Sequence, residues 1–171
     1  MWEGDCLAVP LPLLMEAFMI TGVVHSGISV RNLEESINFY HNILGLELLK
    51  KEPVRKSRGD KLGVPGAEIQ LAVIGIPGTA ETFELIQYLK PSSLFGYGVP
   101  VNTLGCVHIA LRVDDIAGTI TDLKSKGIQF CSDTFEEIKD GPIAGMKWIY
   151  FKDPDGTNLE LIEEPAEYPD S

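Results

Sequence analysis

VVHSGISVRNLEESI at residues 23–37 and CVHIALRVDDIAGTI at residues 106–120 are two versions of one pattern. When the second stretch is shifted back by 83 residues, His108 falls on His25. The aliphatic positions that match at this offset are Val24, Val30 and Ile37 in the first stretch and Val107, Val113 and Ile120 in the second. Repetition along a chain indicates a repeated structural unit. We therefore interpret the sequence as two tandem copies of one unit.

Each copy has the pattern of one strand, one helix and three further strands. The opening segments, 22–30 and 105–113, are rich in β-branched and aliphatic residues, which favours strands. Asn32 and Asp115 then precede apolar residues at helical spacing, as helix N-caps do. The later strands are predicted at 46–51, 67–75 and 81–89 in the first copy and at 128–131, 145–152 and 157–163 in the second.

Turn signals separate these elements. Gly45 and Gly127 are placed to end the two helices, and DPDG at 153–156 is a strong signal for a hairpin turn. The predicted unit is therefore βαβββ, present twice. We expect an α+β fold in which two βαβββ modules pair into a curved mixed sheet around a metal-binding cleft.

The same signals set the expected boundaries. The first residues are apolar but lack the basic start of a signal peptide, because Glu3, Asp5 and Glu16 occur there. We expect an accessory segment, with a helix near residues 13–18. The predicted organisation is an N-terminal extension at 1–20, a first module at 21–92, a linker at 93–104, a second module at 105–165 and a tail at 166–171.

Composition limits the partners and the compartment. With 14 basic against 25 acidic residues the formal net charge is −11, which would repel nucleic acid and an anionic membrane face. No stretch has the roughly twenty apolar residues that span a bilayer. Cys6, Cys106 and Cys131 are far apart in the sequence and form no disulfide framework. The predicted protein is cytoplasmic and binds neither nucleic acid nor membrane.

Alternation along the opening strands separates two rows of side chains, because successive residues of a strand point to opposite faces. The aliphatic row is expected to be buried under the helices and consists of Val24, Ile28, Val30, Val107, Ile109, Leu111 and Val113. The opposite row contains His25 and His108. On the last strands, where FELI repeats as LELI, the same parity places Glu84 and Glu160 at matching points.

The two copies thus provide two imidazoles and two carboxylates at matched positions, which a pseudo-twofold axis can bring together. One such residue alone is better explained as an ordinary core or surface residue, but four matched ones are not, since a buried unpaired carboxylate is costly. Two nitrogen and two oxygen ligands suit a divalent ion such as Zn²⁺, Ni²⁺, Co²⁺, Fe²⁺ or Mn²⁺. The predicted metal ligands are His25, Glu84, His108 and Glu160.

The sequence resembles the vicinal oxygen chelate superfamily, which contains glyoxalases, bleomycin-resistance proteins and extradiol dioxygenases. The resemblance covers about residues 21–165, and its motifs are VHSGISVRNLEESINFYHNILGLELL, TFELIQYL, GCVHIALRVDDIAGTITDLKSKGI and WIYFKDPDGTNLELIEE. It implies paired βαβββ modules around a metal, and frequently a homodimer. It also implies that the four residues named above are the ligands found in four-ligand members.

Glu84 favours one chemistry within this superfamily. Extradiol dioxygenases bind Fe(II) through two His and one Glu, and need no carboxylate at the position of Glu84. The resemblance therefore favours the isomerase and lyase branch, similar to lactoylglutathione lyase and methylmalonyl-CoA epimerase, in which a metal-bound substrate with vicinal oxygens loses and regains a proton. Glu160 is the first candidate for the base, with Glu84 opposing it. An extradiol-type dioxygenase and a non-catalytic bleomycin-resistance-like binding protein are the alternatives.

Candidate substrate-binding residues depart from the glutathione-dependent members. Similar enzymes have an Arg and an Asn four residues after the first two ligands, whereas this chain has Ser29 and Tyr88 there. Arg112, four residues after His108, is a candidate for holding an anionic substrate group, although an ordinary surface arginine explains it equally well. Trp148 and Tyr150 alternate before DPDG and are candidates for an apolar wall of the cleft, or for core packing. The small-molecule substrate itself stays open.

Overall fold

The computed structural model describes residues 20, 22–56, 59–92 and 98–166. The expected helix at 13–18, nearly all of the N-terminal extension and most of the tail lie outside these residues. Of the expected linker, residues 98–104 are described, and they form turns without a strand or a helix. In the described part of the chain, every helix is too short or too polar to cross a membrane.

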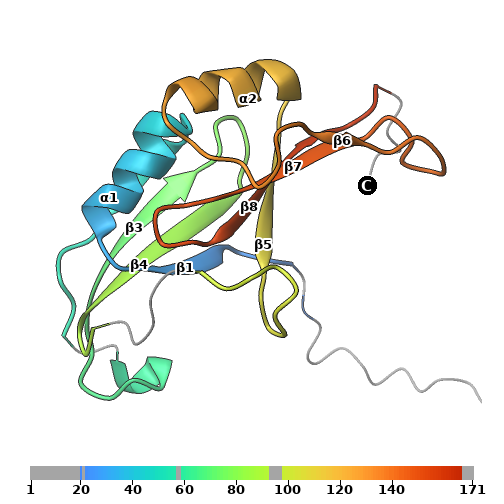
Figure 1. Ribbon diagram of the computed structural model, residues 1–171. Coiled ribbons are helices and arrows are strands. Elements are labelled where there is room, and N and C mark those ends of the chain that lie inside the picture. The colour runs from blue at the N-terminus through green and yellow to red at the C-terminus, as the bar shows by residue number, and fades with distance from the viewer. Residues whose placement is uncertain (1–19, 21, 57–58, 93–97, 167–171) are drawn as a thin grey trace, which may run out of the picture.

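The first module has the predicted order of elements (Figure 1). Strand β1 is parallel to β4, and the other neighbouring strands are antiparallel, in the order β1-β4-β3-β2. The elements are β1 (Ser26–Val30), α1 (Leu33–Ile37), the π-helical segment η1 (Asn38–Ile43), β2 (Glu47–Lys51), the 3₁₀ segment η2 (Gly59–Leu62), β3 (Glu68–Gly75) and β4 (Thr82–Lys90).

The second module repeats this topology. Its sheet has the order β5-β8-β7-β6, again with the opening strand parallel to the last. The elements are β5 (His108–Arg112), α2 (Ile116–Ser125), β6 (Glu136–Glu137), β7 (Lys147–Lys152) and β8 (Asn158–Glu163). The prediction of two βαβββ units in an α+β fold is confirmed.

The helix ends form as the sequence indicates. The Asn32 side chain accepts hydrogen bonds from the backbone N–H groups of Glu34 and Glu35, and the Asp115 side chain accepts one from Gly118. These bonds satisfy amide groups that have no partner within the first helical turn. Gly45 and Gly127 follow the helices with φ of 78° and 89°, a backbone conformation that glycine adopts without steric cost. Both caps and both terminators were predicted correctly.

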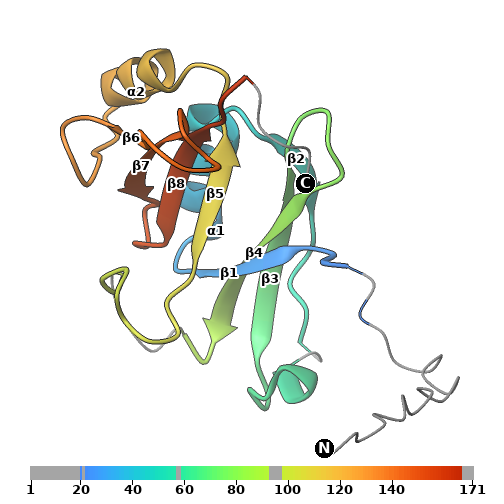
Figure 2. The ribbon, with the colours of Figure 1, turned by 90° about the vertical axis from the view of Figure 1, so that its right-hand side faces the viewer.

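One detail of the prediction is wrong. Residues 128–131 do not form a strand: only Phe130 makes an isolated bridge, to Phe151, and the edge strand is the short β6. The two modules each form a mixed sheet of four strands, as expected of paired βαβββ modules. The edge strands β1 and β5 run in steeply different directions (Figure 1, Figure 2), so their backbone groups do not align for pairing.

The helices cover one face of each sheet and share one core. Helix α1 packs on β3 and β4, and α2 packs on β8. The two helical segments meet at their ends, where Lys126 Nζ donates a hydrogen bond to the carbonyl oxygen of Ile43 at 3.1 Å. A single cluster of buried residues from both modules, including Ile28, Val30, Leu111 and Leu161, fills the space between the sheets and helices. The two modules are therefore one folding unit with a common core.

The predicted aliphatic row is only partly buried. Ile28, Val30 and Leu111 lie in the core as expected, and Ile109 and Val113 pack against it while partly buried. Val24 and Val107, in contrast, are 84% and 74% exposed, so their predicted burial is wrong. Both residues precede their strands, which begin only at Ser26 and His108, so neither is held in the pleated sheet that faces the core.

A buried hydrogen bond joins the DPDG turn of the second module to the first helix. The hydroxyl of Tyr40 donates to Asp153 Oδ2 at 3.0 Å, and Asp153 Oδ1 also accepts from the backbone N–H groups of Asp155 and Thr157. Arg31 N donates to Asp155 Oδ2 at 2.8 Å from the same module as Tyr40. Burial raises the pKa of the Asp153 carboxyl, and burial followed by the charge of Asp153 raises the pKa of Tyr40. The turn predicted from sequence is thus also a junction between modules.

We predict that Tyr40→Phe lowers the free energy of unfolding by about 1–3 kcal/mol at neutral pH, the range for a hydrogen bond to a charged group. Because the pKa of Tyr40 is raised in the folded state, its contribution is complete below the ordinary tyrosine pKa of about 10 and decreases at higher pH. Urea denaturation across the alkaline range should show the wild type and the variant converging above pH ~10. Equal stability at neutral pH would contradict the assignment.

Candidate functional site

The first predicted pair of ligands lies where β1 runs parallel to β4. In the strand register Gly27 is opposite Glu84, and His25 directly precedes the strand. His25 Nε2 lies 3.4 Å from Glu84 Oε2, and the Glu84 side chain is 28% exposed. We call His25 and Glu84 the N-terminal half-site.

The second pair lies at the matching place in the repeat. His108 is the first residue of β5, and Ala110 is opposite Glu160 on β8. His108 Nε2 lies 3.3 Å from Glu160 Oε2, and the Glu160 side chain is only 10% exposed. His108 and Glu160 form the C-terminal half-site.

The spacing within each half-site fits ligands of one cation. Two donor atoms at 2.0–2.2 Å from a divalent ion, with a bond angle of about 90–110°, lie about 3.0–3.5 Å apart. The observed separations of 3.4 Å and 3.3 Å fall within this range. Imidazole nitrogen and carboxylate oxygen are also donors that Zn²⁺ and the neighbouring transition-metal ions accept.

The structure brings the four candidate ligands together as two pairs and not as one set. Among the described residues, no group of three or more His, Cys, Asp and Glu side chains could hold a metal ion. Ile28 of β1 and Leu161 of β8 point into the shared core. Because successive residues of a strand point to opposite faces, each half-site lies on the face of its sheet that is turned away from this core. The sequence leaves open whether one chain or two chains bring the four ligands together, and within the described part of one chain the two pairs stay apart.

Aromatic side chains flank the C-terminal half-site. Tyr150 on β7 is directly opposite Glu160, and its ring meets the His108 ring edge-on at a centroid distance of 5.3 Å. Trp148 packs edge-on against Tyr150 at 5.7 Å. Burial, then the charge and hydrogen bond of Glu160, raises the pKa of Tyr150, which keeps its hydroxyl protonated as a donor. Of the two aromatic residues named from the sequence, Tyr150 thus lies beside His108 and Trp148 packs on Tyr150.

Other candidate substrate residues have different surroundings. Arg112 is exposed and pairs with Glu164, with Nε 2.7 Å from Oε2, so part of its charge is already balanced. Ser29 is exposed on β1 opposite Ile86 of β4, and Tyr88 lies on β4 opposite Ile69 of β3 and is partly buried. Neither Ser29 nor Tyr88 makes a contact with a half-site like the ring contact that Tyr150 makes with His108.

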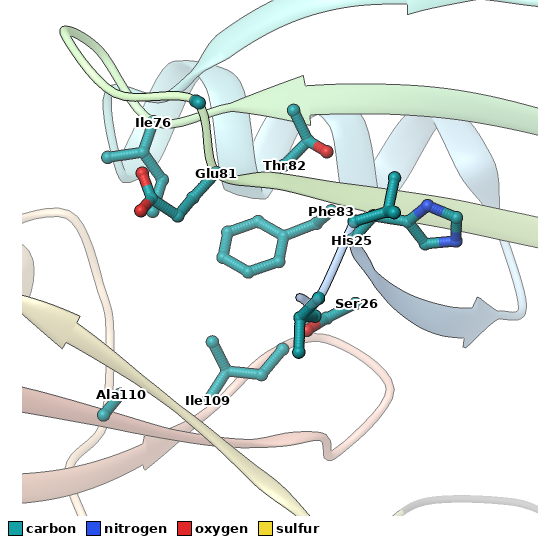
Figure 3. Close-up of a pocket in the computed structure, with 11 residues that line it drawn as sticks. His25, Ser26, Ile76, Glu81, Thr82, Phe83, Ile109 and Ala110 are labelled. Atoms are coloured by element: carbon teal, nitrogen blue, oxygen red, sulfur yellow. The ribbon is translucent and has the colours of Figure 1, made fainter. Parts of the chain in front are cut away.

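A pocket of about 350 Å³ opens beside the N-terminal half-site, between the modules. Figure 3 shows Ile109 and Ala110 of β5 on one side, facing Phe83 across the opening. Its lining is Val23, Val24, His25, Ser26, Ile76, Ala80, Glu81, Thr82, Phe83, Ile109 and Ala110. The mixture of apolar and polar groups suits a small amphipathic molecule next to His25.

Sequence reasoning missed two features of the site. Glu81 and Phe83 line the pocket because the turn between β3 and β4 approaches β5, a tertiary contact without a local signal. The contact of Tyr150 with Glu160 did have a signal. The DPDG turn predicts the hairpin between β7 and β8, and the register of that hairpin, which pairs Lys152 with Asn158 across residues 153–157, places Tyr150 opposite Glu160.

The sequence model described as "Glyoxalase/Bleomycin resistance protein/Dioxygenase superfamily" matches residues 22–161. The chain belongs to this superfamily. The match spans both modules and includes all four candidate ligands.

Curated relatives include enzymes. The chain is 33% identical to a 2-epi-5-epi-valiolone epimerase from Actinomyces sp, over 86% of this chain and 81% of the relative. It is 31% identical to the lactoylglutathione lyase of Escherichia coli O157:H7, over 83% of this chain and 92% of the relative. An epimerase and a lyase among the relatives support an enzyme of this superfamily.

Solved structures share the fold at lower identity. A glyoxalase family protein from Bacillus cereus superimposes with a TM-score of 0.74 at 22% identity, over 88% of this chain and 98% of that protein. TnmS3, an antibiotic binding protein from Streptomyces sp. CB03234, superimposes with a TM-score of 0.53 at 19% identity, over 86% of this chain and all of that protein. Since binding proteins and glyoxalase family proteins share this fold, the site residues must distinguish the functions.

The geometry of the two half-sites predicts that the protein binds one divalent ion per chain. His25→Ala and His108→Ala should each weaken binding by about 10-fold or more, because each removes a nitrogen ligand. Both side chains are about half exposed, so folding should be little affected. Elemental analysis and titration with Zn²⁺ or Co²⁺ measure the effect. Wild-type protein that binds no stoichiometric metal after reconstitution would contradict the ligand assignment.

Proposed function

We propose that this protein is a divalent-metal-dependent enzyme that transfers a proton on a small substrate held through vicinal oxygens, as an isomerase or lyase. The observation that carries the proposal is the pair of His–Glu half-sites, each at metal-ligand spacing. Each half-site contributes a carboxylate as well as an imidazole, so the complete site has both ligands and proton carriers.

The chemistry assigned to the chain's own residues is proton movement by carboxylates. Glu160 is the first candidate for the group that takes a proton from the substrate carbon, and Glu84 is the opposing acid or base. A divalent ion held by the four ligands supplies positive charge that acidifies a C–H bond next to a substrate carbonyl. A carboxylate within contact of that carbon collects the proton without a further histidine.

We further propose that two copies of the chain complete each site. The N-terminal half-site of one protomer would face the C-terminal half-site of its partner, and a twofold dimer would contain two such sites. The surface near the half-sites is apolar and uncovered in the single chain, as expected of an interface. Its most exposed members are Val23 at 89%, Val24 at 84%, Leu104 at 99% and Val107 at 74%.

The relatives support proton transfer at this site. An epimerase inverts a stereocentre, and removal and return of a proton on opposite faces of a carbon accomplishes this. Two carboxylates from different half-sites are suited to that task. Glu84 also weighs against an Fe(II) dioxygenase, in which two His and one Glu suffice, and the retained ligand set weighs against a pure binding protein.

Heterodimers provide a test of the shared site. A dimer of one His25→Ala chain and one His108→Ala chain, isolated with two affinity tags, should bind about one ion, because both changes fall in one of its two sites. The control is a dimer of His25→Ala and Glu84→Ala chains, in which both sites are damaged and no binding should return. Equal, low binding by the two heterodimers would exclude a shared site.

Glu84→Gln and Glu160→Gln test the reaction class. For Glu84→Gln we predict metal binding or turnover weakened by ~10-fold or more, as for a lost charged ligand. At metal concentrations that refill the site, Glu160→Gln should abolish exchange of a substrate C–H with solvent deuterium. NMR on a panel of 2-hydroxyketones, hemithioacetals and 2-methyl-acyl-CoA compounds measures this exchange. Catechol ring cleavage that is insensitive to Glu84→Gln would instead establish a dioxygenase.

A further inference from the structure

The two half-sites differ at one position in the sheet. Glu84 lies between Gly27 and Val73 on the neighbouring strands, whereas Glu160 lies between Ala110 and Tyr150. Both carboxylates thus have a small residue on the parallel side. On the antiparallel side one has an aliphatic neighbour and the other has a tyrosine, so the repeat is not symmetric where the ligands are held.

Tyr150 contacts both members of the C-terminal half-site. Its side chain lies directly opposite Glu160 on the neighbouring strand, where burial and then the charge of Glu160 raise the pKa of its hydroxyl. Its ring lies 5.3 Å from the His108 ring at an interplanar angle of 68°, the edge-to-face arrangement that aromatic pairs prefer. Trp148 packs against the Tyr150 ring with an interplanar angle of 80°, which limits the rotation of that ring. Val73, the counterpart of Tyr150 beside Glu84, has neither a hydroxyl nor an aromatic ring. It therefore cannot make these contacts in the N-terminal half-site.

These contacts restrict the motions that metal binding has to freeze. A free glutamate samples several rotamers, and ordering a flexible side chain at a binding site has an entropic cost. The Tyr150 side chain borders Glu160 across the strand pair, and its ring contact restricts the plane of the His108 imidazole. Residues that orient metal ligands in this way typically change metal affinity by about 10- to 100-fold when they are removed.

We propose that Tyr150 is a positioning residue that holds His108 and Glu160 in the geometry that a divalent cation requires. This assignment rests on the metal site proposed above. It makes the C-terminal half-site the preordered half, which is consistent with the lower exposure of Glu160, 10% against 28% for Glu84. Tyr150 acts through the two ligands and is not itself assigned as a ligand.

Tyr150→Phe, which removes the hydroxyl and keeps the ring, is the central variant. We expect Co²⁺ affinity, measured by chelator competition, to fall by about 10-fold. The visible absorption bands of bound Co²⁺ should also shift, because the orientation of Glu160 in the ligand field changes. Tyr150→Leu removes the ring as well and should weaken binding further.

Tyr40→Phe is the matched control. It removes a tyrosine hydroxyl that donates a hydrogen bond to a carboxylate, Asp153, outside the site. It should lower the thermal midpoint while leaving Co²⁺ affinity and the absorption bands unchanged. A purely structural role for Tyr150 would give the same result for Tyr150→Phe as for this control.

The outcomes separate the two proposals. If wild-type protein binds Co²⁺ and Tyr150→Phe binds it with the same affinity and spectrum, the role of Tyr150 is refuted while the metal site stands. If wild-type protein binds no Co²⁺, the proposed function and this inference both fail. Weakened binding with shifted bands in Tyr150→Phe, absent from Tyr40→Phe, supports the inference.

Discussion

Burial of one face of each sheet beneath α1 and α2 is the constraint on which the rest of the structure depends. Ile28 and Leu161 point into the common core, and alternation then sends the ligand-bearing rows to the opposite faces. In the described part of the chain the two rows do not come together as one set of metal-ligating side chains. The packing of the apolar core thus leaves the two His–Glu pairs apart.

This division links assembly, metal binding and chemistry. If two copies complete each site, a metal ion bound across the interface stabilises the dimer as well as the fold, because binding to the assembled state alone shifts the equilibrium toward it. The exposed residues Val24 and Val107 lie close to His25 and His108 in the sequence, so apolar contact and metal ligation would form together. The core and the DPDG junction, in contrast, are complete within the single chain.

The fold alone does not determine the function, and the side chains of the two half-sites reduce the number of functions that fit. A glyoxalase family protein and an antibiotic binding protein share the architecture, so fold alone does not separate a binder from an enzyme. The carboxylates Glu84 and Glu160, each beside a histidine, are the groups on which the proposed proton transfer depends. Tyr150 distinguishes the second half-site from the first and shows that an internal repeat can diverge at one strand position while keeping its ligands.

The sequence by itself determined the repeat, the βαβββ order, the caps at Asn32 and Asp115, and the His–Glu pair of each module. These depend on local signals: side-chain periodicity, hydrogen-bonding caps and glycine at positive φ. The exposure of Val24 and Val107, the separation into two sheets and the distance between the half-sites were decided by tertiary structure. The reason is physical: strand alternation fixes which residues share a face, but only the packing of helices between modules fixes where that face points.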